Sequence, residues 1–204
     1  MQLRFRPPRP SDRNAILRVF GEEPTEEQLA AVAGDPAKAA RYRRAVARLL
    51  VTDAALARTI VAVDEADNVV GFVQWGAEAG EHVTLGLAAR VVRAVGPLGI
   101  RRFLRHEKLR ARVAIKAPEG SFHIAEIHVL ASGRGNGVGA ALLQQAEAEA
   151  RIQSSTQLSL TTATNNPARR LYEREGFRLV ETRTDPEFEH ATGVAGRVLM
   201  VKSL

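Results

Sequence analysis

The residues best suited to chemistry in this chain lie in a glycine-rich turn at positions 133–139. The turn reads Gly133-Arg-Gly135-Asn-Gly137-Val-Gly139 and follows an apolar run that ends at Leu130. Glycines let the backbone turn sharply and approach a ligand closely. If a helix begins at this turn, its first N–H groups have no partner inside the helix and lie at the positive end of the helix dipole. We therefore expect the turn to bind a diphosphate, with the guanidinium of Arg134 adding a permanent positive charge.

Other interpretations of the same turn fit less well. A simple strand-to-helix turn does not require alternating glycines together with an arginine. The pattern Gly135-x-Gly137-x-x-Ala140 fits the dinucleotide-binding fingerprint, which also needs an acidic residue about 20 positions later, at the end of the next strand. The expected strand at 158–164 contains no acidic residue. The lysine and hydroxyl of a P-loop are also absent, which argues against an ordinary nucleotide triphosphatase.

A second motif begins about thirty residues after the first. It reads Asn165-Asn-Pro-Ala168-Arg-Arg-Leu171-Tyr172-Glu-Arg-Glu-Gly176-Phe177. Together with Arg134-x-x-Gly137-x-Gly139, in this order and spacing, it resembles the GCN5-related N-acetyltransferase (GNAT) superfamily. That superfamily has an R/Q-x-x-G-x-G/A loop followed by N-x-x-A-x-x-L-Y-E-x-x-G-F. The resemblance covers residues 122–180, about a third of the chain.

The resemblance implies that the chain binds acetyl-CoA as a co-substrate and needs no metal. In this family the loop and the helix start bind the diphosphate, mostly through backbone N–H groups; the matching positions are Arg134, Gly135, Asn136, Gly137, Val138, Gly139 and Ala140. The end of the preceding strand binds the pantetheine arm like an added strand, a role that falls to Ile127, Val129 and Leu130. The N–H of Val129 is the family's usual donor to the thioester oxygen. Asn165 matches the asparagine near the pantetheine, and a one-residue slip in this turn would put Asn166 there instead.

The resemblance also gives Tyr172 a role in the reaction. Tyr172 matches the tyrosine that protonates the departing thiolate. A phenol has a pKa near ~10 and a thiol a pKa near ~8.5, so a phenol within hydrogen-bond reach can act as a general acid toward the sulfur. The alternative is a tyrosine that only covers the core between a helix and the sheet.

Three candidates remain for the group that accepts the proton of the amine. His123 matches a position where some branches of the family carry a glutamate or a histidine, and a histidine titrates near ~6.5. Glu126 lies three positions later, on the opposite face of a regularly alternating strand, although a β-bulge would bring both residues to one face. Water or a residue elsewhere is the third candidate. A strand histidine without a role is the simplest alternative for His123.

The elements that must position these residues form a single domain over residues 1–204. The patterns predict strands at 3–6, 59–63, 69–75, 122–130, 158–162, 177–182 and 198–202. They predict helices beginning near 11, 25, 35, 137 and 167, with the third reaching about residue 51. Hairpins alternate with βα units, so we expect the α/β (α+β) class with helices on both faces of the sheet. The resemblance adds that this sheet is mixed and mostly antiparallel.

A long basic segment separates the third and fourth expected strands. We expect residues 79–120 to form a helical insertion of two amphipathic helices, broken at Gly96-Pro97. Between positions 86 and 116 nine basic residues face one acid, Glu107, and the rest of the chain is slightly acidic. The helices could overhang the acceptor site, form a solvated face whose apolar side packs on the sheet, or bind a nucleic acid or an acidic membrane surface. Phe103 is the only aromatic residue there, which gives little support for base stacking.

Composition narrows the remaining classes. The chain has 204 residues, of which 45% are hydrophobic and 25% charged, as in a soluble globular protein. The absence of cysteine excludes disulfides, thiolate metal sites and a cysteine nucleophile. No apolar run is long enough to span a membrane, and the N-terminus lacks a secretory apolar core, so we expect a cytoplasmic protein.

The expected function is that of an acetyl-CoA-dependent N-acetyltransferase in which a primary amine attacks the thioester directly. The acceptor is a small molecule or a peptide whose identity the sequence does not specify, and a homodimer is compatible with the sequence. One alternative is a module that binds acyl-CoA without catalysis. The other is a nucleic-acid-binding protein that uses the basic segment at 86–116.

Overall fold

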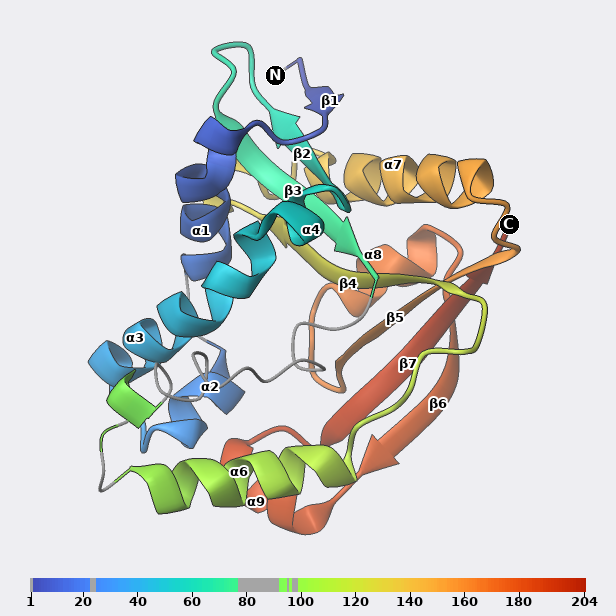
Figure 1. Cartoon of the computed structure of the whole chain (residues 1–204). Helices are drawn as coiled ribbons and strands as arrows, with labels where there is room; N and C mark the ends of the chain where they lie inside the picture. Colours follow the sequence, from blue (N-terminus) through green and yellow to red (C-terminus); the bar gives the residue numbers. More distant parts are fainter. Residues whose placement is uncertain (1, 23–24, 77–91, 95, 97–98) are drawn as a thin grey trace.

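The fold is built on one seven-stranded sheet. The computed structural model describes residues 2–22, 25–76, 92–94, 96 and 99–204. The strands lie in the order β1-β2-β3-β4-β5-β7-β6 (Figure 1). Their bounds are β1 Arg4–Arg6, β2 Thr59–Val63, β3 Val69–Trp75, β4 Phe122–Val129, β5 Gln157–Ala163, β6 Arg178–Thr184 and β7 Gly196–Ser203. All neighbouring strands are antiparallel except β4 and β5, which are parallel.

Helices cover both faces of the sheet and one of its ends (Figure 1). On one face lie α1 (Arg13–Gly21), α3 (Pro36–Ala47) and α4 (Asp53–Leu56), and on the other lie α7 (Val138–Ile152) and α8 (Arg169–Arg174). At one end α2 (Glu26–Ala31), α6 (Ile100–Arg112) and α9 (Pro186–Thr192) contact one another. The expected fold class, a mixed and mostly antiparallel sheet between helices, is confirmed.

The alternation of apolar residues along the central strands produces two separate cores. Val73 of β3 packs with Leu142 and Ala146 of α7, whereas its neighbour Phe72 packs with Ile16 of α1 on the opposite face. Successive strand side chains point to opposite faces, so a continuous apolar strand such as β3 supplies both cores. The sheet is therefore buried on both sides at its centre, where β4 lies.

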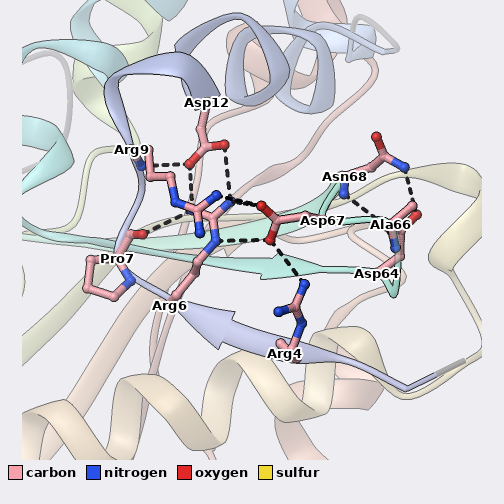
Figure 2. Close-up of polar contacts among 9 residues, drawn as sticks. All are labelled: Arg4, Arg6, Pro7, Arg9, Asp12, Asp64, Ala66, Asp67 and Asn68. Atoms are coloured by element: carbon pink, nitrogen blue, oxygen red, sulfur yellow. Dashed lines mark hydrogen bonds and ion pairs between the residues drawn. The ribbon is translucent and has the colours of Figure 1, made fainter.

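The edge strand β1 is held by ion pairs, as Figure 2 shows. Arg4, Arg6 and Arg9 all contact the carboxylate of Asp67 in the turn between β2 and β3. Arg6 also contacts Asp12, with Nη1 2.6 Å from Oδ2, and both side chains are largely buried. The hydrogen bond from the Arg6 guanidinium holds the pKa of the Asp12 carboxyl below its ordinary value. These contacts anchor a three-residue strand that has few hydrogen bonds of its own.

The structure differs from the sequence-based expectations at several element ends. The third helix ends at Ala47 and continues as a 3₁₀ helix over Arg48–Val51, where a single helix to residue 51 was expected. Helices α4 and α9 were not expected. The signals for α9 were present, because Asp185 caps the helix by accepting from the N–H of Phe188, Pro186 occupies the first turn, and Gly193 ends it at φ 73°.

The basic segment contributes α6, whose apolar side packs mainly on other helices and meets the sheet at Ala163, the last residue of β5. Phe103 lies edge-on to Tyr42 of α3, with ring centroids 5.4 Å apart. Leu109 and Val113 pack with Phe188 of α9. The first helix expected in this segment, with its break at Gly96-Pro97, falls mostly on residues outside the described ranges. Among the helices that the structure describes, none is both long and apolar enough to cross a membrane.

Candidate functional site

The parallel strands β4 and β5 pair only at their first residues and then diverge. Phe122, His123 and Ile124 align with 158–160, and no pairing follows. Beyond that point β4 remains paired with β3 alone. The N–H of Leu130 donates to Val70 O at 2.9 Å, on the β3 side. Because backbone groups of consecutive strand residues point in opposite directions, those of Ile127 and Val129 point toward the side that β5 has left.

Of the three residues expected to bind pantetheine, two therefore present backbone groups to this opening. Leu130 does not, because its N–H is donated to Val70 and its carbonyl accepts from the N–H of Gly133 at 2.9 Å. The carbonyl of Val129 accepts from Nε of Arg134 at 3.4 Å. Its N–H lies on the same edge of the strand and faces the opening between β4 and β5.

A β-bulge at Ala125 decides on which face of the sheet the two candidate bases lie. Ile124 aligns with Trp75 and Glu126 with Gln74, so Ala125 is an extra residue on β4. In consequence Ile124 and Ile127, three positions apart, both pack in the core below α7. His123 and Glu126 then share the opposite face.

The ring of His123 is oriented by two serines. Nδ1 of His123 lies 2.9 Å from Oγ of Ser159, which lies 2.8 Å from Oγ of Ser121. Ser121 donates its only hydroxyl proton to the carbonyl of Pro118 at 2.7 Å, so it must accept from Ser159. Ser159 has then used its own proton and must accept from Nδ1–H of His123. This hydrogen bond orients the imidazole of His123.

Glu126 has a different neighbour. Its Oε2 lies 2.8 Å from Nε2 of His128. The ring of His128 stacks on Phe72 at 5.4 Å and meets Phe20 edge-on at 5.0 Å. The aromatic contacts fix the imidazole, and the imidazole in turn orients the carboxylate.

The glycine-rich turn is open to solvent. Positions 134–137 are exposed, and a Cβ atom added at Gly135 or Gly137 would meet no atom within 4 Å. Both glycines have a positive φ, 79° and 77°, which most side chains disfavour. Gly137 is the N-cap of α7, and no side chain caps the helix there. The first N–H groups of α7, from Val138 onward, are thus directed at a surface that a ligand can reach.

Residues in and beside the turn contact other segments of the chain. Gly139 allows α8 to pack closely on α7, because a Cβ at this position would lie 2.9 Å from Cδ2 of Leu171. Arg134 reaches Oε2 of Glu22 at 3.7 Å, and the same oxygen accepts from the N–H of Ala131 at 2.8 Å. Ala140 continues the first turn of the helix.

The two asparagines after β5 have separate contacts. Asn166 accepts from the N–H of Ala168 at 2.9 Å and donates to Oγ1 of Thr162 at 2.6 Å, so it stabilises the turn into α8. Asn165 is exposed and donates to Oε2 of Glu26 in α2 at 3.3 Å. The side chain of Asn166 is thus used inside the turn, whereas that of Asn165 lies at the surface.

Tyr172 lies on α8 in the core below α7. It is 5% exposed, and its ring meets that of Phe177 edge-on at 6.2 Å. Burial, together with the negative charge of Glu126, raises the pKa of the phenol to about 12. Tyr172 is therefore protonated at neutral pH and lies near enough to Glu126, on the other face of the sheet, to sense its charge.

Comparison with known proteins settles the family. The sequence profile of the Acetyltransferase (GNAT) family matches residues 33–177, well over half of the chain. The chain belongs to this family. The match includes both β4 and the glycine-rich turn, together with α8.

Solved structures share the fold. A protein from Corynebacterium glutamicum, described as histone acetyltransferase HPA2 and related acetyltransferase, is 21% identical with a TM-score of 0.63, covering 100% of this chain and 97% of its own. PaiA N-acetyltransferase from Thermoplasma acidophilum, in complex with coenzyme A, is 13% identical with a TM-score of 0.58 and full coverage of both chains. At these identities the likeness concerns the fold. A search of curated protein sequences finds no match to this chain.

Sequence reasoning missed the partners of the site residues. Ser159 lies between two leucines in the strand at 158–160, a sequence pattern that is typical of a buried, hydrogen-bonded hydroxyl. The structure shows that Ser159 is fully buried. Glu22, which contacts Arg134 and the backbone of Ala131, lies 109 positions from the latter and carried no such signal. Within the described residues, no group of three or more histidine or acidic side chains could hold a metal ion.

Proposed function

We propose that this protein is an N-acetyltransferase that transfers an acetyl group from acetyl-CoA to a primary amine. The observation that carries the proposal is the continuity of one strand, turn and helix. The β4 edge presents the N–H of Val129 where β5 diverges, and the same chain then forms the open, uncapped start of α7. PaiA N-acetyltransferase, which shares this fold, was solved in complex with coenzyme A.

The open turn and the start of α7 bind the diphosphate of the coenzyme in this proposal. Exposed N–H groups and the helix dipole favour an anion there, and Arg134 adds its charge. Ile127 and Val129 bond the pantetheine arm along the β4 edge. Acetyl-CoA supplies the activated acetyl group, and Asn165 lies on the neighbouring turn.

His123 is the base that we favour. Ser159 orients its imidazole through Nδ1, and the imidazole accepts a proton from the attacking amine. Glu126 lies on the same face of β4 and is the second candidate, oriented by His128. The amine nitrogen forms its bond to the acetyl carbon while the N–H of Val129 donates to the carbonyl oxygen.

Tyr172 protonates the leaving sulfur as the carbon–sulfur bond breaks. A phenol whose pKa is raised to about 12 holds its proton at neutral pH and transfers it only to a strong base such as the developing thiolate. The phenolate is then reprotonated from solvent. The products are the acetylated amine and free coenzyme A.

The test is the release of coenzyme A thiol from acetyl-CoA in the presence of a panel of amines, with mass spectrometry of the products. His123→Gln and Glu126→Gln separate the two candidate bases, because loss of the base lowers kcat and removes the acidic limb of the pH–rate profile. Coenzyme binding without any acetylated product would instead identify an acyl-CoA-binding module.

A further inference from the structure

A cavity of about 660 Å³ lies between α2, α6 and α9, away from the glycine-rich turn. Its polar lining consists of basic groups, namely Arg101, Arg102, Arg105, His106 and His190. The apolar lining includes Leu109 and Ala191. Cavities of this volume fit small molecules.

The arginines of this lining have no acidic partners among the described residues. In the part of the chain that the structure describes, no carboxylate pairs with Arg101, Arg102 or Arg105. The only acid on α6, Glu107, is bound to Arg110 at 2.9 Å. Arginines three and four positions apart on a helix repel one another, so this arrangement favours an anion in the cavity. Arg102 is also held in place, because its Nε donates to the carbonyl of Ala30 at 3.2 Å.

A buried histidine in the same lining has a single, long polar contact. His106 is 7% exposed, and the described residues offer no hydrogen-bond partner to its Nε2. Its nearest acidic atom, Oε1 of Glu107, lies 3.5 Å from Nδ1. Buried polar groups are normally satisfied, so an imidazole left unsatisfied beside a cationic cavity points to a ligand.

The cavity lies beside the end of β5 that has diverged from β4. Leu109 and Ala191, which line it, belong to an apolar cluster that packs on Ala163, the last residue of β5. Helix α2, which forms another side of the cavity, contacts the turn after β5, because Glu26 accepts a hydrogen bond from Asn165 at 3.3 Å. The cavity is therefore close to the turn that follows β5.

We propose that this cavity binds an anionic group of the acceptor, so that the substrate is a small amine that also carries a phosphate or a carboxylate. This rests on the proposed acetyl transfer. Guanidinium groups pair with both anions in two-pronged geometry, and a lining of three arginines repels polyamines. The size of the cavity and the single aromatic residue of the segment favour a small anion over a nucleic acid.

Matched acceptors test the proposal. Ethanolamine and O-phosphoethanolamine differ by the phosphate, and an amino acid and its amide differ by the carboxylate. We expect the anionic member of at least one pair to have the higher kcat/KM. Arg101→Gln/Arg105→Gln should then raise the KM for that member about tenfold or more and leave kcat and the KM for acetyl-CoA unchanged. Lys108→Gln, an exposed change on the same helix outside the cavity, is the control.

A binding measurement separates failure of this inference from failure of the proposed function. Calorimetric titration of pyrophosphate into protein saturated with coenzyme A should show binding that the double variant loses and Lys108→Gln keeps. If coenzyme A itself does not bind, the proposed function fails, and the same titration of the free protein, with an Arg134→Gln background, still tests the cavity. Equal pyrophosphate affinity or equal KM in the wild type and the double variant would overturn the inference, as would a preference for the neutral or polycationic acceptors.

Discussion

Two arginine-rich regions of this protein handle their charge in opposite ways. At the β1 edge, Arg4, Arg6 and Arg9 converge on Asp67, and Arg6 also holds the buried carboxylate of Asp12 (Figure 2). On α6, three arginines line a cavity without an acidic partner among the described residues.

This contrast separates polar groups that stabilise the fold from polar groups that remain available to a ligand. Polar groups that satisfy one another lower the free energy of the folded state, whereas unsatisfied ones raise it and persist where they serve binding or catalysis. The open start of α7 and the N–H of Val129 resemble the α6 cavity in this respect. Substitutions at the β1 edge should therefore change stability but not rate, and substitutions around the β4–β5 opening should do the reverse.

The largest effect is expected for Tyr172→Phe. Loss of the proton donor should lower kcat about 100-fold, equivalent to about 3 kcal/mol in the barrier, while coenzyme affinity and the melting temperature stay close to those of the wild type. Steady-state thiol release and calorimetric binding measure the two quantities. An unchanged kcat would show that Tyr172 serves only the core beside Phe177.

Asp12→Asn should have its effect on stability alone. It leaves the guanidinium of Arg6 without its closest carboxylate, and we expect the free energy of unfolding to fall by about 1–2 kcal/mol, since solvent screens part of the interaction. Urea denaturation measures this value, and kcat/KM should not change. Arg4→Gln, which removes a more exposed contact, is the matched control and should have a smaller effect. A loss of activity at constant stability would contradict the assignment of the β1 edge to stability alone.

The contribution of Asp12 to the free energy of unfolding should depend on pH. The pKa of Asp12 is lowered in the folded protein, so its contribution is present above the ordinary value of ~3.9 and is lost as the pH falls through the folded-state pKa below that value. The difference in unfolding free energy between the wild type and Asp12→Asn should be constant from pH 7 to about 5 and shrink toward pH 3. A difference that grew on acidification would contradict the assignment.

Ser159→Ala should slow catalysis through His123. Without its hydrogen bond to Ser159 the imidazole loses its fixed orientation, and we expect kcat to fall about tenfold, the free energy of roughly one hydrogen bond, with a shift of the acidic limb of the pH–rate profile. Ser121→Ala keeps the bond between Ser159 and His123 and should have a smaller effect. Equal pH–rate profiles for the wild type and Ser159→Ala would remove the serine from the mechanism.

The smallest effect is expected for Arg105→Gln. This change removes a charge that has no acidic partner and lies four positions from Arg101, so the protein should be unchanged or more stable by a few tenths of a kcal/mol. Thermal denaturation at low ionic strength gives the sign. A clear destabilisation would show that Arg105 supports the fold, and the contrast with the β1 edge would disappear.

The family and most of the helices and strands could be predicted from local sequence patterns. The order of the glycines and Arg134 before the Asn165–Phe177 motif resembles the pattern of the family, and Gly135 and Gly137 of this turn have the positive φ that glycine allows. Alternation and capping signals located all seven strands and the helices α1, α2, α3, α7 and α8. These are local properties, which neighbouring residues encode.

Contacts between residues far apart in the chain could not be predicted in this way. The bulge at Ala125 put His123 and Glu126 on one face, the pairing of β4 with β5 brought Ser159 to His123, and the packing of α6 on α9 formed the cationic cavity. Each of these depends on register or on contacts between segments far apart in the chain. A one-residue change of register reverses the face of every following side chain, so no local pattern in the sequence could specify them.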